Sequence, residues 1–232
     1  GPDICLDLAF ADLPCRPVVL CDKNLLVNRA EQLGKSVILR DFQAIYPDIQ
    51  IHLNQQDSAA MPQVLAAGES DLCLCSALPM TEHSAWAYLW SEELFVAVPL
   101  GHPFADRVSI DLHELEYESF IALKNNYSLR ILVDQFFDLA GIHPEITFEG
   151  GDISTLSGLV SAGLGISILP KPTGFEHPEL RYIPISFPLC KRALGVAWNA
   201  QRQLPPAAVN FQQFLIRRFD DVSEKSFVEQ PA

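Results

Sequence analysis

The sequence contains no apolar run long enough to cross a lipid bilayer. A membrane-spanning helix needs roughly 18 consecutive apolar residues, whereas the apolar stretch LFVAVPL at 94–100 is interrupted by Pro99 and followed by Gly101. No basic segment followed by an apolar core and a cleavage site opens the chain, so nothing in it marks export. We therefore expect a cytoplasmic protein that makes no contact with a membrane.

Positive charge is scarce. The chain carries 16 Lys and Arg residues against 29 Asp and Glu residues, which gives a net charge of −13. Such a surface repels phosphate backbones, whereas domains that bind nucleic-acid duplexes carry a basic patch. We expect that this sequence does not bind nucleic acid by itself, although a separate domain could.

Signatures of catalysis and of cofactor binding are missing as well. The sequence holds no G-x-S-x-G, no H-E-x-x-H and no phosphate-binding P-loop, the patterns that mark hydrolases, zinc proteases and nucleotide-binding loops. Its acidic residues are scattered, and no pair has a spacing that favours acid–base chemistry. We therefore expect neither an enzyme nor a bound cofactor.

The cysteines indicate a reduced protein without a metal site. A chain of 232 residues that is 49% hydrophobic can build a core without disulfide bonds. Cys73 and Cys75 lie two residues apart, which places both on one face of a strand. With His83 they form only a weak zinc signal, because a structural zinc site needs four ligands at defined spacing. The six cysteines are at positions 5, 15, 21, 73, 75 and 190.

What is present is an alternation of strand-like and helix-like patterns, which favours an α/β fold with parallel strands. An extended apolar passage at 86–107 separates two such units. We predict two lobes, the first built from 16–93 and 192–219 and the second from 94–191, with the chain crossing between them twice. Strands are expected at 16–22, 49–54, 71–78, 119–123, 145–150, 164–170, 180–187 and 192–200, and helices at 24–46, 58–68, 109–117, 128–140, 152–163 and 207–219.

Two glycines in LVSAGLGISILP (159–170) raise the question of a phosphate-binding loop. In the predicted order they follow a helix, whereas the glycines of a phosphate-binding loop follow a strand and open a helix. We instead expect Gly163 to end the helix in the left-handed conformation and Gly165 to allow close backbone approach at the start of the next strand.

Four stretches carry a family resemblance: FQAIYPDIQIHL (42–53), LAAGESDLCLC (65–75), VAVPLGHPFA (96–105) and VSAGLGISILP (160–170). In this order and spacing they resemble the effector-binding domain of LysR-type transcriptional regulators, over roughly 16–219. The resemblance implies two Rossmann-like subdomains joined by two crossover strands, a fold of the type 2 periplasmic-binding-protein kind. It also implies a small-molecule effector between the lobes and a DNA-binding head ahead of this region, which the sequence given does not contain.

Ligands of open α/β sheets bind at the carboxyl ends of strands and at helix N-termini. The segment KNNYSLR (124–130) places cations and hydroxyls around a helix start without a carboxylate, so we expect the effector to be an organic anion. For Asp57, Ser128 and Asp152, a role as helix N-cap is as strongly expected as a role in effector binding. The candidate effector-binding residues are Asp22, Lys23, Asn24, Asp57, Ser58 and Ser76 in the first lobe and Lys124, Asn125, Tyr127, Ser128, Arg130 and Asp152 in the second.

The resemblance further implies a homodimer or a higher homo-oligomer, with the helices at 58–68 and 128–140 as candidate contacts. Phe136 and Phe137 are neighbours on the second helix. We expect at most one of them to point fully into its own core, leaving the other for a partner.

Two alternatives remain open from the residues. An extracytoplasmic solute-binding protein would share the two-lobe fold, although the crossover and glycine motifs favour the regulator. Peroxide-sensing relatives carry cysteines where this chain has Ser128 and Phe137, and serine cannot undergo thiolate oxidation. Cys21 leaves a minor possibility of thiol chemistry, and the segment CDKN at 21–24 departs from the polar Ser or Thr that is usual in the family.

Overall fold

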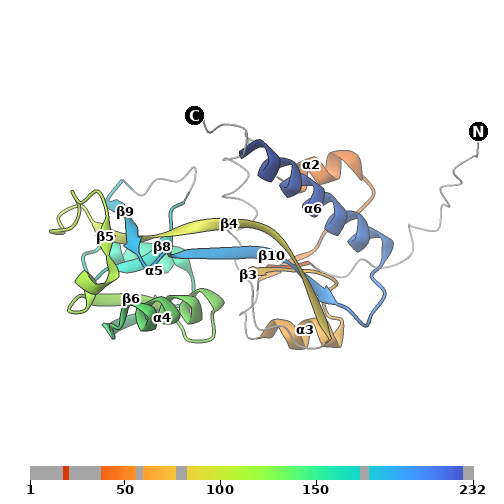
Figure 1. Ribbon diagram of the computed structural model, residues 1–232. Helices are drawn as coiled ribbons and strands as arrows, with labels where there is room; N and C mark the ends of the chain where they lie inside the picture. The colour runs from red at the N-terminus through yellow and green to blue at the C-terminus, as the bar shows by residue number, and fades with distance from the viewer. Residues whose placement is uncertain (1–17, 21–37, 56–59, 77–82, 173–177, 227–232) are drawn as a thin grey trace, which may run out of the picture.

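The computed structural model of this protein describes residues 18–20, 38–55, 60–76, 83–172 and 178–226. Two lobes lie side by side, and two long strands, β4 and β10, run through both of them (Figure 1). The elements in chain order are β1 (Val18–Leu20), α2 (Ile38–Ile45), β2 (Leu53–Gln55), α3 (Met61–Ala67), β3 (Cys73–Ser76), β4 (Ser84–Pro99), β5 (Ile110–Asp111), the 3-10 helix η3 (Leu112–Leu115), β6 (Ser119–Leu123), α4 (Ser128–Ala140), β7 (Glu145–Gly150), α5 (Ile153–Ser161), β8 (Ser167–Pro170), β9 (Leu180–Phe187), β10 (Lys191–Asn199) and α6 (Pro206–Ser226).

An eight-stranded mixed sheet extends through both lobes in the order β2-β1-β3-β10-β4-β9-β5, and β8 pairs with β4 as well. The strands β2, β1 and β3 are parallel, whereas β10 is antiparallel to both of its neighbours. In the second lobe β6 and β7 form a separate parallel pair. Helices alternate with parallel strands in both lobes, between β2 and β3 and between β6 and β7, so the predicted α/β class is confirmed.

The core is divided between the two lobes. One buried cluster draws all its members from 94–190, and a second combines residues of 38–90 with residues of 194–219. Phe42 of α2 lies in the second cluster, with its ring centroid 4.9 Å from that of Phe211 on α6. Trp90 of β4 stacks on Phe219 of α6 at 4.5 Å. The closing helix therefore packs against the first lobe, as Figure 1 shows for α6 and α2.

Several local predictions are confirmed. Gly163 has a left-handed φ of 76°, and its N–H bonds to the Val160 carbonyl at the end of α5. A Cβ added to Gly165 would stand 2.5 Å from the Ser119 carbonyl oxygen, which is the close approach expected there. Asp152 caps α5, because its carboxylate accepts a hydrogen bond of 2.9 Å from the Thr155 N–H.

Two predictions differ from the structure. The capping residue of α4 is Tyr127 with extended backbone, and Ser128 is the first helical residue; a bond from Tyr127 N–H to the Lys124 carbonyl tightens the preceding turn. The expected helix at 109–117 is β5 followed by the short η3, whose start is fixed by a capping box between Asp111 and Glu114. Of the expected helix at 24–46, the described part is helical as α2 (Ile38–Ile45), and residues 24–37 lie outside the described residues.

The two neighbouring phenylalanines of α4 correct a further expectation. Phe136 and Phe137 are both buried, with 7% and 5% of their surfaces exposed. Adjacent helical residues are separated by only about 100° around the axis, and the apolar face of a core helix is wide enough to hold both. The large apolar residues of α4 that remain exposed are instead Ile131 and Leu139, at 44% and 67%.

Cys73, Cys75 and Cys190 are unbridged and buried. Burial raises the pKa of the Cys190 thiol to about 12. Within the described ranges, no group of three or more His, Cys, Asp or Glu side chains is placed to hold a metal ion. No helix among these residues is both long enough and apolar enough to span a membrane.

Candidate functional site

The carboxyl ends of β6 and β7 lie next to each other at one edge of the second lobe. Leu123 is in register with Gly150, and the Lys124 N–H donates to the Gly150 carbonyl at 3.1 Å. The chain then enters α4 after the first strand and α5 after the second, so the N-terminal ends of both helices are at the same edge. The first N–H groups of a helix lack intrahelical partners and attract negative charge.

Most of the second-lobe candidates lie at this edge. Lys124 and Asn125 are exposed, and Tyr127 and Ser128 are half-buried. Tyr127 reaches across to the second loop, because a Cβ added to Gly151 would lie 3.9 Å from its hydroxyl oxygen. The structure therefore brings Lys124, Asn125, Tyr127, Ser128 and Asp152 to one place, although their contact with an effector stays a prediction.

Arg130 is engaged within its own lobe. Its Nη1 donates to the Leu123 carbonyl at 2.9 Å and to Glu149 Oε1 at 2.7 Å, and its Nε donates to the Asp134 carboxylate at 2.9 Å. Burial by itself lowers the pKa of Arg130, but the hydrogen bonds to Glu149 and Asp134 raise it above its usual value. Arg130 thus ties the start of α4 to β6 and β7, with its charge largely compensated.

The same contacts correct the expectation that this helix start has no carboxylate nearby. Asp134 lies four residues after Arg130 on α4, a spacing that the sequence does display. Glu149 comes from β7, nineteen residues along the chain, and only the parallel pairing of β6 with β7 places it there. Lys124 consequently carries the exposed positive charge of the KNNYSLR segment.

The first-lobe candidates are placed differently. Ser76, at the end of β3, is 6% exposed and is in register with Leu194 of β10. Leu194 belongs to the core cluster that includes α2 and α6, and paired residues of antiparallel strands share a face. The Ser76 side chain therefore points toward that helical layer. The other first-lobe candidates, Asp22, Lys23, Asn24, Asp57 and Ser58, lie outside the described residues.

A small cavity lies inside the second lobe, lined by β6, α4, α5 and β8, with Leu123, Arg130, Leu156 and Ser167 among its walls. It has a volume of about 10 Å³, which is roughly the room that one water molecule needs. An organic effector does not fit there. The candidate site is the open edge at the starts of α4 and α5, where Lys124 and Asn125 are exposed.

The strands that join the lobes carry charged residues that are not among the candidates predicted from the sequence. Between the two larger cores, Arg192 pairs with Glu92 and Lys191 pairs with Glu93 across β10 and β4. Arg192 is 4% exposed, whereas the Lys191 side chain is 44% exposed. The opposite charges in SEELF and CKRAL were visible in the sequence, but their contact requires the antiparallel register of the two strands.

Comparisons with known proteins give the family. Residues 36–220 match the model of the LysR substrate binding domain. The HTH-type transcriptional regulator YybE of Bacillus subtilis (strain 168) is 44% identical over 184 residues, which cover 79% of this chain and 63% of that protein. The chain thus spans less than two thirds of this relative's length.

Solved structures share the fold. The effector-binding domain of QuiR in complex with shikimate matches with a TM-score of 0.79 at 24% identity, covering 89% of this chain and 97% of that one. The regulatory domain of CcmR from Synechocystis PCC6803 in complex with 2-PG matches with a TM-score of 0.76 at 22% identity, again over 89% and 97%. These likenesses confirm the predicted two-lobe fold of the type 2 periplasmic-binding-protein kind.

A short match of another kind involves an enzyme. A stretch of 42 residues is 81% identical to 4-hydroxythreonine-4-phosphate dehydrogenase of Neisseria meningitidis serogroup B (strain ATCC BAA-335 / MC58), but it covers 18% of this chain and 13% of that enzyme. A match over so small a part of either chain indicates neither the family nor an activity of this protein.

The family match begins later than the resemblance in the sequence indicated, at residue 36 in place of about 16. Asp22, Lys23 and Asn24 precede it, so it lends no support to them as effector ligands. Between the regulator and the solute-binding protein, the match decides for the regulator. Over 36–220, and in agreement with the two-lobe architecture, this chain belongs to the LysR substrate binding domain family.

Proposed function

We propose that this domain binds a small organic anion between its two lobes and passes the resulting change to a DNA-binding domain of the same protein, in the cytoplasm. The observation that carries the proposal is the meeting of the α4 and α5 N-terminal ends at the β6–β7 edge, with Lys124 exposed beside them. Two N-terminal helix ends and a lysine favour a carboxylate or phosphate group. The ligands named for QuiR and CcmR, shikimate and 2-PG, are anions of this kind.

The lobe boundaries follow from the same reasoning and remain part of the proposal. Subdomain I would comprise 16–93 and 192–219, and subdomain II would comprise 94–191. Neither of the two larger cores includes the residues between Trp90 and Leu94 on β4 or those between Cys190 and Leu194 on β10. Closure of the lobes over an effector bends the two strands at these residues, and it thereby changes the orientation of a DNA-binding domain attached to subdomain I.

We further propose that the domain forms a homodimer or a higher homo-oligomer. Of the two helices expected at the contact, α4 exposes Ile131 and Leu139, which lie two helical turns apart on one side. Two exposed aliphatic side chains on one side of a helix support an interface there. The protein would reach DNA only through its DNA-binding domain.

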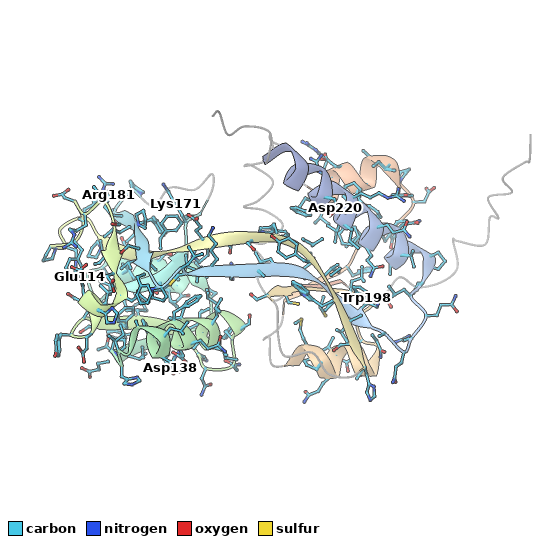
Figure 2. All side chains as sticks on the ribbon, in the orientation of Figure 1. Glu114, Asp138, Lys171, Arg181, Trp198 and Asp220 are labelled. Carbon is cyan, nitrogen blue, oxygen red and sulfur yellow. The ribbon has the colours of Figure 1, made fainter. Side chains whose placement is uncertain are left out.

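The effector can be sought by native mass spectrometry of the purified protein, which detects a small molecule that copurifies with it. Calorimetry with that molecule then compares the wild type with Lys124→Ala and Ser128→Ala. Each substitution removes a group beside the α4 start, so we expect about a tenfold loss of affinity for Lys124→Ala and a smaller loss for Ser128→Ala. Arg181→Ala is the control, because Arg181 is an exposed cation at the start of β9, opposite Val98 near the end of β4 and away from this edge (Figure 2). Unchanged affinity in both site variants places the effector elsewhere.

A further inference from the structure

The pairing of β4 with β10 gives this two-stranded ribbon two distinct faces. Residues paired across antiparallel strands point to the same face. Leu194 pairs with Trp90, and both belong to the core that includes α2 and α6. Ala197 pairs with Trp86, and both pack in the cluster formed with α3. One face of the ribbon is therefore turned toward α2 and α6, and the other toward α3.

A β-bulge changes which residues reach the α3 face. Leu194 is paired with Trp90 but Gly195 with Tyr88, so Leu89 is the extra residue. Tyr88 shares a face with Trp86, two residues earlier, and the bulge adds Ser91 to that face. The Tyr88 hydroxyl oxygen accordingly lies 3.2 Å from Ser91 Oγ. Without the bulge, residues three apart on a strand would point to opposite sides.

Gly195 makes the aromatic arrangement on this face possible. A Cβ at Gly195 would collide with the Cε2 and Cζ2 atoms of the Trp86 indole and with the Ala87 carbonyl oxygen. The indole therefore lies directly over the β10 backbone. The Tyr88 ring meets it edge to face, with centroids 6.3 Å apart and planes at 66°. Together the two rings form an aromatic pair on the α3 face of β4, with Tyr88 the nearer of the two to the join between the lobes.

The Tyr88 end of this aromatic pair is open. Tyr88 is 51% exposed and Ser91 is exposed, whereas Trp86 is half-buried against α3. The helices α3 and α4 lie on the same side of the β4–β10 ribbon (Figure 1). The exposed ring and the hydroxyl pair thus lie on the face of the ribbon that is shared with the candidate anion site at the start of α4.

We propose that Tyr88 is a specificity-determining residue of the effector site and that the effector is a ring-bearing carboxylate. Its carboxylate is bound at the start of α4, and the face of its ring packs on Tyr88. The Tyr88 and Ser91 hydroxyls hydrogen-bond to a polar substituent of that ring. Tyrosine supplies a large contact area and a hydrogen-bonding group with few rotatable bonds to restrain. This inference rests on the proposed function and adds to it the chemical class of the ligand.

Two sets of acids test the proposal on the intact chain. One set holds ring-bearing monocarboxylates, including shikimate and benzoate, and the other holds open-chain monocarboxylates, including glycerate and butyrate. Binding is measured by calorimetry and by quenching of tryptophan fluorescence, to which Trp86 contributes beside Tyr88. We expect ring-bearing acids to bind and open-chain acids to bind at least tenfold more weakly.

The variants then separate the roles of the ring and of the hydroxyls. Tyr88→Ala should weaken binding of the ring-bearing acids at least tenfold, and Ser91→Ala should weaken shikimate, which carries ring hydroxyls, more than benzoate. Tyr117→Ala is the matched control, because Tyr117 is 93% exposed and follows η3, whose Glu114 lies at the outer end of the second lobe (Figure 2). Near-ultraviolet circular dichroism and the melting temperature verify that each variant is folded.

Each other outcome has a defined meaning. Equal or tighter binding of the open-chain acids overturns the ring-bearing class. Loss of binding in Lys124→Ala with full binding in Tyr88→Ala overturns the role of Tyr88 while leaving the proposed function intact. If no acid of either set binds to the wild type, the ring-bearing class is overturned; if inorganic phosphate does not bind either, the proposed anion-binding function fails as well.

Discussion

Replacement of Arg192 by methionine should destabilise the protein far more than the same change at its neighbour Lys191. Arg192 is 4% exposed and pairs with Glu92, whose side chain is 23% exposed. Removing one partner of a buried ion pair costs about 3–5 kcal/mol, because the other charge is left without compensation. Water reaches Glu92 in part, so we expect a loss of about 2–4 kcal/mol for Arg192→Met. The comparable pair of Lys191 and Glu93 is exposed on both sides, and its loss should cost less than about 1 kcal/mol.

Urea denaturation, followed by tryptophan fluorescence, gives the free energy of unfolding for both single variants. The double variant Arg192→Met/Glu92→Met should recover most of the loss, since it removes both charges and leaves apolar groups of similar length. The reasoning is refuted if Arg192→Met costs no more than Lys191→Met, or if the double variant is no more stable than Arg192→Met alone.

Three further predictions concern other parts of the fold. Gly165→Ala should destabilise the protein by about 1–3 kcal/mol, because φ at this position is 155° and a Cβ would stand 2.5 Å from the Ser119 carbonyl oxygen; Gly101→Ala, where nothing lies within 4 Å, is the control in the same denaturation experiment. Burial raises the pKa of Cys190 to about 12, so the unfolded chain, with a thiol pKa of about 8.5, loses this proton first as the pH rises. The contribution of Cys190 to stability is therefore complete below about pH 8.5 and should decline above it by up to about 1.4 kcal/mol per pH unit. Between pH 8 and pH 10, the urea midpoint of Cys190→Ala should fall less than the urea midpoint of the wild type. An equal fall in the two proteins would contradict this role of Cys190. Ile131→Glu/Leu139→Glu should shift the protein toward monomer in analytical ultracentrifugation at micromolar concentration, because two charges replace the exposed aliphatic groups of α4; a wild type that is monomeric throughout argues against the interface.

The features that the sequence predicted well depend on neighbours along the chain. The strand β6 and the helix α4 have the expected bounds, because apolar residues such as Leu129 and Val133 recur at helical spacing and Gly141 ends the helix at a φ of 68°. Asp152 was read as a helix cap because the cap and the amide that it binds are three residues apart. The family motifs are likewise short and local, and they are sufficient to predict the fold.

The features that the sequence did not predict depend on pairing between distant segments. The sequence predicts Arg130 as a cation without a carboxylate partner. In the structure it donates a hydrogen bond to Glu149, because the register of β6 with β7 places Glu149 beside it. Tyr88 was absent from the candidates, because its place on the open face depends on a bulge defined by its partner strand. Ser76 was included for its position at a strand end, yet its pairing with Leu194 turns it toward the opposite helical layer.

The division of the core has a consequence for how the chain folds while it is being synthesised. All members of the 94–190 cluster leave the ribosome in one continuous segment, so this part can pack as soon as it is complete. The other large cluster needs Phe42 and Leu72 from the beginning of the chain and Phe211 and Phe219 from its end. At ~5–20 residues per second, the early apolar residues wait on the order of ten seconds for their partners. During that interval these apolar residues lack half of their core, and apolar surface exposed in this way is prone to aggregation.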